Sequence, residues 1–375
     1  MSRSESYLRK FWKILIALIA ARTFLVFLLI ALDFPPTPDH NGWFFHHGGD
    51  EYLYFTLAKS LVDLRPVQSM YPLGFPMILA PLIYLFKATV PNDILIPSVV
   101  INALIMFNLS IILVALIAEK LTRNKLISLL SATLWTFFPY LSLLMINRYE
   151  FIHLMCVQEL SDPPSMFFSV LATYIFLLSR ERNGRLLAVL AGAMIGFASL
   201  IRISNLLLVA VFIFMLIYEK RFKNLAYVAV TAFLVFSPQL IYNSLFFGSP
   251  LAFGYQYYLE PGLIETGGHL VFSLAYFPSF FARTIIQTPL VFLSALLGSI
   301  LLYTYAKRKI ETIMLLCWQL SYQVFYSFYW YSEWTMWRFI MPAIPALCVL
   351  ASSFVLIFDE RKVQSIMRIL KLRHP

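Results

Sequence analysis

Long apolar runs, separated by short polar segments, dominate the chain from residue 14 to residue 358. A helix needs about 20 predominantly apolar residues to cross the hydrocarbon core of a bilayer. Ten runs approach that length, and each predicts a membrane-spanning helix. They lie near 14–32, 98–118, 126–146, 164–179, 186–201, 203–218, 225–246, 287–306, 312–331 and 339–358.

An eleventh apolar run, 74–90, is ambiguous, and the distribution of charge decides how to interpret it. If 74–90 does not cross, most of the 29 lysines and arginines fall on one side of the membrane. By the positive-inside rule that side is cytoplasmic, and it holds both termini. Counting 74–90 as a crossing would invert every later loop and destroy this bias. The sequence therefore predicts ten spans and a long first outer loop, 33–97.

Composition supports a polytopic membrane protein with an all-α bundle. Hydrophobic residues make up 60% of the 375 residues and charged residues only 13%, and the mean hydropathy is +0.77. We expect one transmembrane domain over 1–375, with no separate soluble domain. The net charge of +10 reflects orientation in the lipid bilayer, so nucleic acid is not an expected partner. The basic loops contain no Gly-rich phosphate-binding motif.

The segment 46–81, HHGGDEYLYFTLAKSLVDLRPVQSMYPLGFPMILAP, is unusually polar for this chain. Asp50 and Glu51 follow a double glycine and begin a helical pattern with Tyr54 on its apolar face. This predicts a short amphipathic helix along the membrane surface. Asp50 lies near its start, where a carboxylate is favoured. The YPLGFP motif predicts a second short juxtamembrane helix. Most other acidic residues also fall in outer loops, so we expect the site to face the periplasm, cell exterior or lumen.

Five motifs, taken in order, resemble those of the GT-C membrane glycosyltransferases. They are GGDEYLYFTLAKSL, YPLGFPMILAP, LSDPPSMFF, YNSLFFGSPLAFGY and WRFIMPAIPAL. Within that family the resemblance is to protein O-mannosyltransferases and lipid A aminoarabinose transferases. It implies a GT-C-type bundle and transfer of a sugar, with inversion, from a polyprenyl-phosphate donor to an acceptor hydroxyl. The acceptor, whether protein, lipid or glycan, stays open, as does the sugar.

The resemblance also implies roles for the outer acids. Asp50 corresponds to the catalytic carboxylate of the first outer loop, and we expect it to act as general base. Glu51 is expected to bind the sugar through hydrogen bonds between its carboxylate and the sugar hydroxyls. Asp162, in LSDPP, resembles the family's second outer acid, although an Asp before proline also serves as a plain helix N-cap. Glu159, three residues earlier, is the alternative candidate for this second acid.

Cations are needed where the leaving polyprenyl phosphate develops negative charge. The candidates are Arg202, Arg338, Arg148 and Lys59. Each has a plain alternative as an interfacial arginine or lysine whose charge reaches the membrane surface. A charge within an apolar stretch, as at Arg202, costs roughly 2.5–3.5 kcal/mol unless it pairs or lines a wet cavity.

The chain departs from the mannosyltransferase branch in one respect. That branch places an arginine two residues before a Pro-Ser pair, whereas Pro97-Ser98 here follows Leu95-Ile96. Another residue must therefore hold the phosphate.

Further substrate contacts are expected from His47, Tyr54 and Tyr71. The adjacent histidines 46 and 47 do not have a standard metal-ligand spacing, so no metal or other cofactor is predicted.

A different class of protein also fits the pattern. A multi-pass transporter or lipid flippase would use buried charges such as Arg22 and Arg202 as substrate contacts. Transporters are expected to carry inverted repeats with discontinuous helices in both halves. The concentration of acids in the outer loops favours the enzyme.

Overall fold

The computed structural model describes residues 3–32, 50–145, 160–182, 184–255, 272–329 and 337–358. Within these ranges the regular secondary structure is helical, apart from one isolated antiparallel bridge between Phe272 and Tyr329. The expectation of an all-α protein is therefore confirmed. The first half contains α1 (Arg3–Ala31), α2 (Asp50–Val62), α3 (Gly74–Phe86), η1 (Pro91–Ile94), α4 (Leu95–Val99), the π-helix η2 (Val100–Met106), α5 (Phe107–Thr122), α6 (Lys125–Met145) and α8 (Asp162–Arg182).

The second half continues as a series of helices with several breaks. α9 and α10 are separated at Arg202, and α13 meets α14 at a bend of 94°. The elements are α9 (Arg185–Ile201), η3 (Ile203–Asn205), α10 (Leu206–Tyr218), α11 (Phe222–Phe247), η5 (Leu274–Tyr276), α13 (Phe277–Gln287), α14 (Pro289–Thr304), α15 (Lys309–Ser327), η6 (Met341–Ala343), α17 (Ile344–Ser352) and η7 (Ser353–Phe358).

Four helical segments of the described chain are long and apolar enough to cross a membrane, or up to five if the bent pair counts as one span. They are Phe11–Leu28, Pro91–Thr122, Phe222–Phe247 and Trp337–Phe358. The count of ten spans thus stays a prediction. In α3, 13 residues rise only about 20 Å, less than the roughly 30 Å of a hydrocarbon core. α10, in the predicted span 203–218, also has only 13 residues, so helix length does not decide whether 74–90 crosses.

The surface of the bundle is apolar where helices face outward. Phe24 on α1 and Phe233 and Leu245 on α11 are exposed. Large apolar side chains exposed in this way are favourable in contact with lipid and unfavourable in contact with water. Together with the long apolar helices, they define an integral membrane protein.

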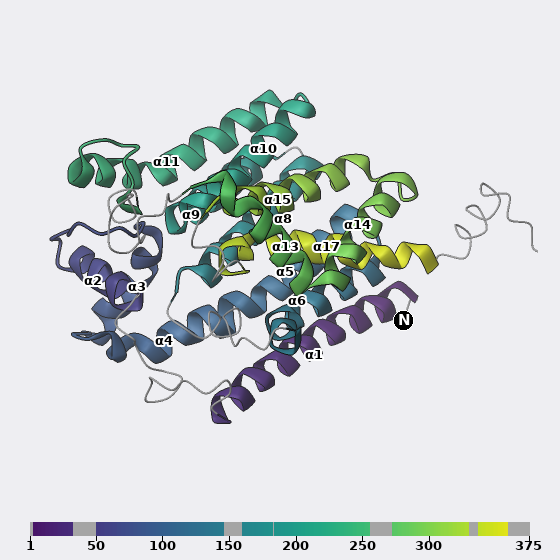
Figure 1. Cartoon of the computed structure of the whole chain (residues 1–375), viewed down its shortest axis with the longest axis horizontal. Coiled ribbons are helices and arrows are strands. Elements are labelled where there is room, and N and C mark those ends of the chain that lie inside the picture. Colours follow the sequence, from purple (N-terminus) through teal and green to yellow (C-terminus); the bar gives the residue numbers. More distant parts are fainter. Residues whose placement is uncertain are drawn as a thin grey trace, which may run out of the picture.

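The two ends of the bundle differ (Figure 1). The start of α1 and the end of η7 lie at one end, and α2 and α3 lie at the other. One large apolar core joins them, and it includes Tyr54 on α2 and Phe75 on α3 as well as Phe11 on α1 and Leu356 on η7.

Glycines allow α9 and α11 to pack closely. Gly192 and Gly196, four residues apart on α9, face α11. A Cβ on Gly192 would lie 2.6 Å from the carbonyl oxygen of Val228, and one on Gly196 would lie 2.6 Å from that of Ala232. Glycine therefore lets two backbones approach in a way that a larger residue would prevent.

Arg22 has internal partners, as its position in an apolar run requires. It is fully buried, donates to the Ala103 carbonyl and the Asn108 side chain, and lies 4.1 Å over the Phe107 ring. These contacts tie α1 to the π-helix η2 and to α5.

Candidate functional site

Arg338 lies between two carboxylates that are far apart in sequence. Its Nη2 donates to Asp50 Oδ2, and its Nε donates to Asp162 Oδ2 at 3.0 Å. Arg338 belongs to the helical turn just before η6, so one guanidinium joins the start of α2, the start of α8 and the last long apolar segment. The planar guanidinium group carries several N–H donors in a fixed geometry and can therefore bridge two carboxylates.

Arg202 completes the cluster from the opposite side of Asp162. Its Nη1 donates to Asp162 Oδ1, and its guanidinium carbon lies 5.3 Å over the Phe339 ring. The residue stands at the break between α9 and α10, with extended backbone (φ −142°, ψ 119°). Two carboxylates and two guanidinium groups are thus gathered in one place, with formal charges that cancel.

The two acids owe their positions to helix starts. Asp50 is the first residue of α2 and Asp162 the first residue of α8. Free backbone N–H groups and the helix dipole favour negative charge at both positions. The side chains differ in access to solvent, because that of Asp50 is 30% exposed and that of Asp162 is 0% exposed.

Tyrosines surround Asp50. The Tyr71 hydroxyl donates to Asp50 Oδ1 at 2.6 Å, and its ring lies 4.4 Å from that of Tyr54 and 5.9 Å from that of Tyr255. Tyr54 in turn shares a hydrogen bond of 2.9 Å with Ser161, the residue before Asp162. α2 and α8 are therefore joined twice, once through Arg338 and once through this pair.

The electrostatics keep Asp50 ionised. Burial acts to raise its pKa, but Arg338 and the Tyr71 hydroxyl outweigh that effect and hold the pKa of the Asp50 carboxyl below its ordinary value of 3.8. Burial, followed by Tyr54 and Asp50, raises the pKa of Tyr71. Tyr71 therefore stays protonated and remains a hydrogen-bond donor to Asp50 at neutral pH.

The loop that carries Tyr71 is held by α11. Gln239 accepts from the Leu73 backbone at 2.9 Å, and the Tyr242 hydroxyl accepts from the Ser69 backbone and donates to the Val67 carbonyl, both at 2.7 Å. These bonds bracket Tyr71 on both sides.

The start of α3 also packs directly on the residues before Arg202. A Cβ on Gly74 would lie 2.4 Å from the backbone nitrogen of Ile201. The Tyr71 loop and the Arg202 break are therefore placed against each other by backbone contact.

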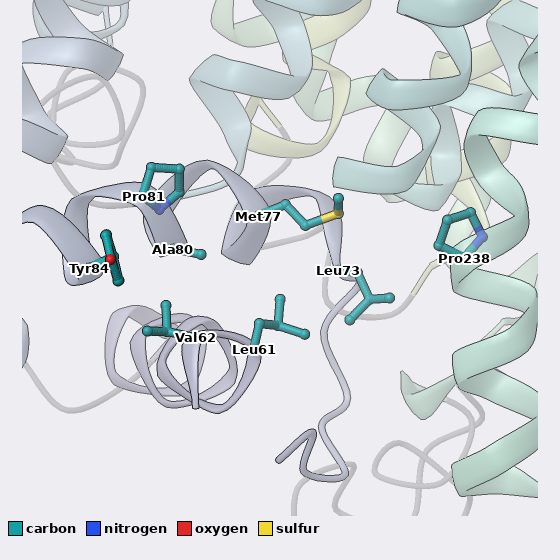
Figure 2. A pocket seen from close by; sticks show the side chains of 8 residues that line it. All are labelled: Leu61, Val62, Leu73, Met77, Ala80, Pro81, Tyr84 and Pro238. Carbon is teal, nitrogen blue, oxygen red and sulfur yellow. The ribbon is translucent and has the colours of Figure 1, made fainter. Parts of the chain in front are cut away.

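An apolar groove of about 570 Å³ opens between α2, α3 and α11 (Figure 2). It begins at Leu73, two residues after Tyr71, and runs between the end of α2 and the length of α3. Apart from Tyr84, its lining side chains are wholly apolar. They are Leu61, Val62, Leu73, Met77, Ala80, Pro81, Tyr84 and Pro238.

Of the residues predicted from sequence, the structure gathers Asp50, Asp162, Arg202 and Arg338, with Tyr54 and Tyr71 beside them. Glu51 is buried next to Asp50 and forms no ion pair with a described residue. Lys59 does not reach the cluster, because it lies two and a half turns further along α2 and its Nζ is 3.5 Å from the Ala88 carbonyl. The predicted His47, Arg148 and Glu159 lie outside the described residues.

Three residues of the site were not anticipated: Ser161, Tyr255 and Asn205. Ser161 and Tyr255 belong to the LSDPP and FGSPLAFGY motifs, so the motifs contained a signal. Asn205 donates to the Ala198 carbonyl, beside the Arg202 break, at 2.7 Å, and it stands in an apolar run without a periodic polar pattern.

The described residues do not form an evident metal site. No group of three His, Cys, Asp or Glu side chains is gathered among them. All four carboxylate oxygens of Asp50 and Asp162 accept from Tyr71, Arg202 or Arg338. Cationic donors thus stand where a cation shared by these acids would bind.

No family model matches the chain, and no curated protein matches it in sequence. Solved structures do match it in fold. An oligosaccharyltransferase from Archaeoglobus fulgidus, in the apo form, matches with a TM-score of 0.55 and 17% identity, over 99% of this chain and 53% of that one. The archaeal oligosaccharyltransferase AglB from the same organism, in complex with an inhibitory peptide and a dolichol-phosphate, gives 0.56 and 16%, over 98% and 53%.

ArnT from Cupriavidus metallidurans, bound to undecaprenyl phosphate, matches with a TM-score of 0.54 and 15% identity, over 95% of this chain and 62% of that chain. The chain spans about half the length of the oligosaccharyltransferase structures. It therefore shares a helical fold with these oligosaccharyltransferase and ArnT structures, and its resemblance to the GT-C glycosyltransferases had implied a bundle of this kind.

Proposed function

We propose that this protein is a glycosyltransferase that moves a sugar from a polyprenyl-phosphate donor to an acceptor hydroxyl. The observation that carries the proposal is the cluster of Asp50, Arg338, Asp162 and Arg202, placed beside an apolar groove in a bundle of this fold. The ligands bound by the structures of similar fold, dolichol-phosphate and undecaprenyl phosphate, support a lipid-linked donor.

Asp50 is the general base. Its carboxylate is ionised and, at 30% exposure, is the most accessible of the four charged side chains. The acceptor oxygen attacks the anomeric carbon and gives its proton to Asp50, while the bond between that carbon and the phosphate oxygen breaks. The electron pair of that bond leaves with the phosphate, and the configuration of the sugar inverts. Loss of a positioned base typically costs 10²–10⁴-fold in rate.

Arg338 and Arg202 hold the donor phosphate. The phosphate gains a negative charge as the sugar departs, and preorganised guanidinium groups stabilise that charge. Because the resting cluster is neutral, the phosphate competes with the carboxylates for these donors. Arg338 is the residue that changes partner, since its contact with the partly exposed Asp50 is easier to exchange than its contact with Asp162.

Asp162 positions the two arginines. Its side chain is fully buried, and each oxygen accepts from a different guanidinium. A carboxylate without access to solvent cannot take a proton from an acceptor. Asp162 therefore orients the phosphate-binding groups, and its role in catalysis is indirect.

The groove accommodates the hydrocarbon tail of the donor. Its lining is apolar, and it opens at Leu73 close to the Tyr71–Asp50 pair. The tail enters laterally from the bilayer, and the phosphate then reaches the arginines. The basic loops support a cytoplasmic position for the termini, which would put the cluster on the periplasmic, exterior or lumenal side.

The test is transfer of labelled sugar by purified protein from short-chain polyprenyl-phosphate donors to a panel of peptide, lipid and glycan acceptors. Wild type should transfer sugar with at least one pair. Movement of the lipid donor across liposomes without any sugar transfer would instead identify a transporter.

A further inference from the structure

Asn205 is a fully buried side chain that uses every hydrogen-bonding position it has. Its Nδ2 donates to Ser165 Oγ at 2.8 Å and to the Ala198 carbonyl at 2.7 Å. Its Oδ1 accepts from Ser169 Oγ at 3.0 Å and from the Tyr322 hydroxyl at 2.7 Å. One amide thus ties together α8, the end of α9 and α15.

These bonds meet at the break that carries Arg202. The Ala198 carbonyl accepts from the Arg202 backbone at 2.9 Å as well as from Asn205, and the Asn205 backbone donates to the Arg202 carbonyl at 3.0 Å. Ser165 lies on α8 one turn after Asp162. The same side chain therefore fixes the backbone of Arg202 and the helix that begins with Asp162.

Packing alone does not require an asparagine here. A buried amide costs free energy unless all its polar atoms are paired, and an apolar residue of similar volume would fill the space without that risk. The break at Arg202, by contrast, leaves the end of α9 without its next helical turn. The Asn205 side chain gives the Ala198 carbonyl a second donor beside the Arg202 backbone N–H, and so adds a bond across the break that carries Arg202.

We infer that Asn205 is a positioning residue for the donor-phosphate site. It holds the Arg202 guanidinium against Asp162, and through Asp162 it also sets the position of Arg338. This role rests on the proposed function, because it assumes that Arg202 binds the donor phosphate.

The test is a double-mutant cycle on steady-state kinetics with a short-chain polyprenyl-phosphate donor. Asn205→Leu keeps the approximate size of the side chain and removes all four hydrogen bonds. It should raise the KM for the donor about tenfold, with a smaller change in kcat, because misplacing Arg202 weakens a charge-assisted contact. In an Arg202→Ala background the same substitution should change KM less than about twofold.

Two further variants keep the test decisive. Tyr322→Phe removes one bond to Asn205 and keeps the ring, so it should raise KM to a smaller extent and should also lose its effect in the Arg202→Ala background. It replaces Asn205→Leu if that variant does not fold. Ser128→Ala is the matched control, since it removes a buried hydrogen bond of 2.6 Å to the Ala115 carbonyl at the α5–α6 contact, and it should leave KM unchanged.

The outcomes separate the two claims. Effects of Asn205→Leu and Arg202→Ala that simply multiply would show that Asn205 only stabilises the fold, and this would overturn the inference. A wild-type protein that transfers no sugar would overturn the proposed function instead.

Discussion

Replacing Arg338 with alanine should weaken donor binding more than any change outside the cluster. The guanidinium contacts both Asp50 and Asp162, and its removal changes the net charge of the four-residue cluster from zero to −1. The donor phosphate then loses the Arg338 hydrogen-bond donor and is repelled by the net negative charge of the cluster. Losing one charge-assisted hydrogen bond costs about 1.5–3 kcal/mol, which corresponds to roughly a tenfold to hundredfold weaker affinity.

The fold should survive this substitution. Removing one partner of a buried ion pair costs about 3–5 kcal/mol when it leaves a charge uncompensated. Here Asp162 keeps its contact with Arg202, and Asp50 keeps both the Tyr71 hydroxyl and access to solvent. We therefore expect a loss of stability well below that range.

The assay is binding of a short-chain polyprenyl phosphate to purified protein, measured with the thermal stability of each variant. Arg338→Lys should bind with intermediate affinity, because a lysine keeps the charge but cannot bridge both acids. Arg221→Ala is the matched control, since Arg221 pairs with Glu219 at 3.2 Å between α10 and α11 and should not affect binding. Wild-type affinity in Arg338→Ala would refute the assignment of the phosphate to this arginine.

Three other predictions concern the charge of the cluster and the side of the membrane that it faces. The acid limb of the pH profile of kcat/KM should lie below pH 3.8, because Arg338 keeps Asp50 ionised down to its lowered pKa. In Arg338→Ala the pKa of Asp50 rises, so the acid limb should move to higher pH. An acid limb that does not move would contradict the pairing of Arg338 with Asp50. EDTA should leave the transfer rate within about twofold of its starting value, because guanidinium groups supply the positive charge beside the phosphate; a rate lost in EDTA and restored by a divalent cation would contradict this. A reporter fused after Lys125, Lys223 or Lys309 should be cytoplasmic, and one inserted near Thr89 should be outside; a cytoplasmic reporter at Thr89 would exclude the predicted topology.

The sequence identified the charged residues of the cluster for a simple physical reason. Charges are expensive in an apolar chain, so each one that interrupts an apolar run needs a partner or a function. Asp50, Asp162 and Arg338 come from three separate motifs, Arg202 interrupts an apolar run, and the structure brings all four together. The order of those motifs also indicated the fold.

The pairing within the cluster could not be predicted in the same way. Which arginine contacts which acid depends on how α2, α8 and the turn before η6 pack, and this is a property of tertiary structure. Lys59 shows the limit most clearly. Its charge resembles that of the other candidates, but its place near the end of α2 points it to the Ala88 carbonyl.

Asn205 was missed because it stands just after Arg202 and Ser204, and these few polar residues form no periodic pattern in an apolar run. The number of spans could not be settled by hydropathy either, since α9, α10 and α13 are short helices that end at breaks or bends. Hydropathy detects apolar length and does not detect where a helix stops.

The central claim is that Asp50 removes the acceptor proton, and one substitution tests it directly. Asp50→Asn keeps the size of the side chain and most of its hydrogen bonding while removing its basicity. With purified protein, labelled donor and a competent acceptor, we expect sugar transfer to fall by about 10²–10⁴-fold. Thermal stability should stay near that of wild type, and donor binding should be at least as tight, because the substitution removes a carboxylate that competes with the phosphate for Arg338. Glu51→Gln, measured alongside, should lose less activity, because an amide can keep contacts to a bound sugar. Sugar transfer at the wild-type rate by Asp50→Asn would contradict the account.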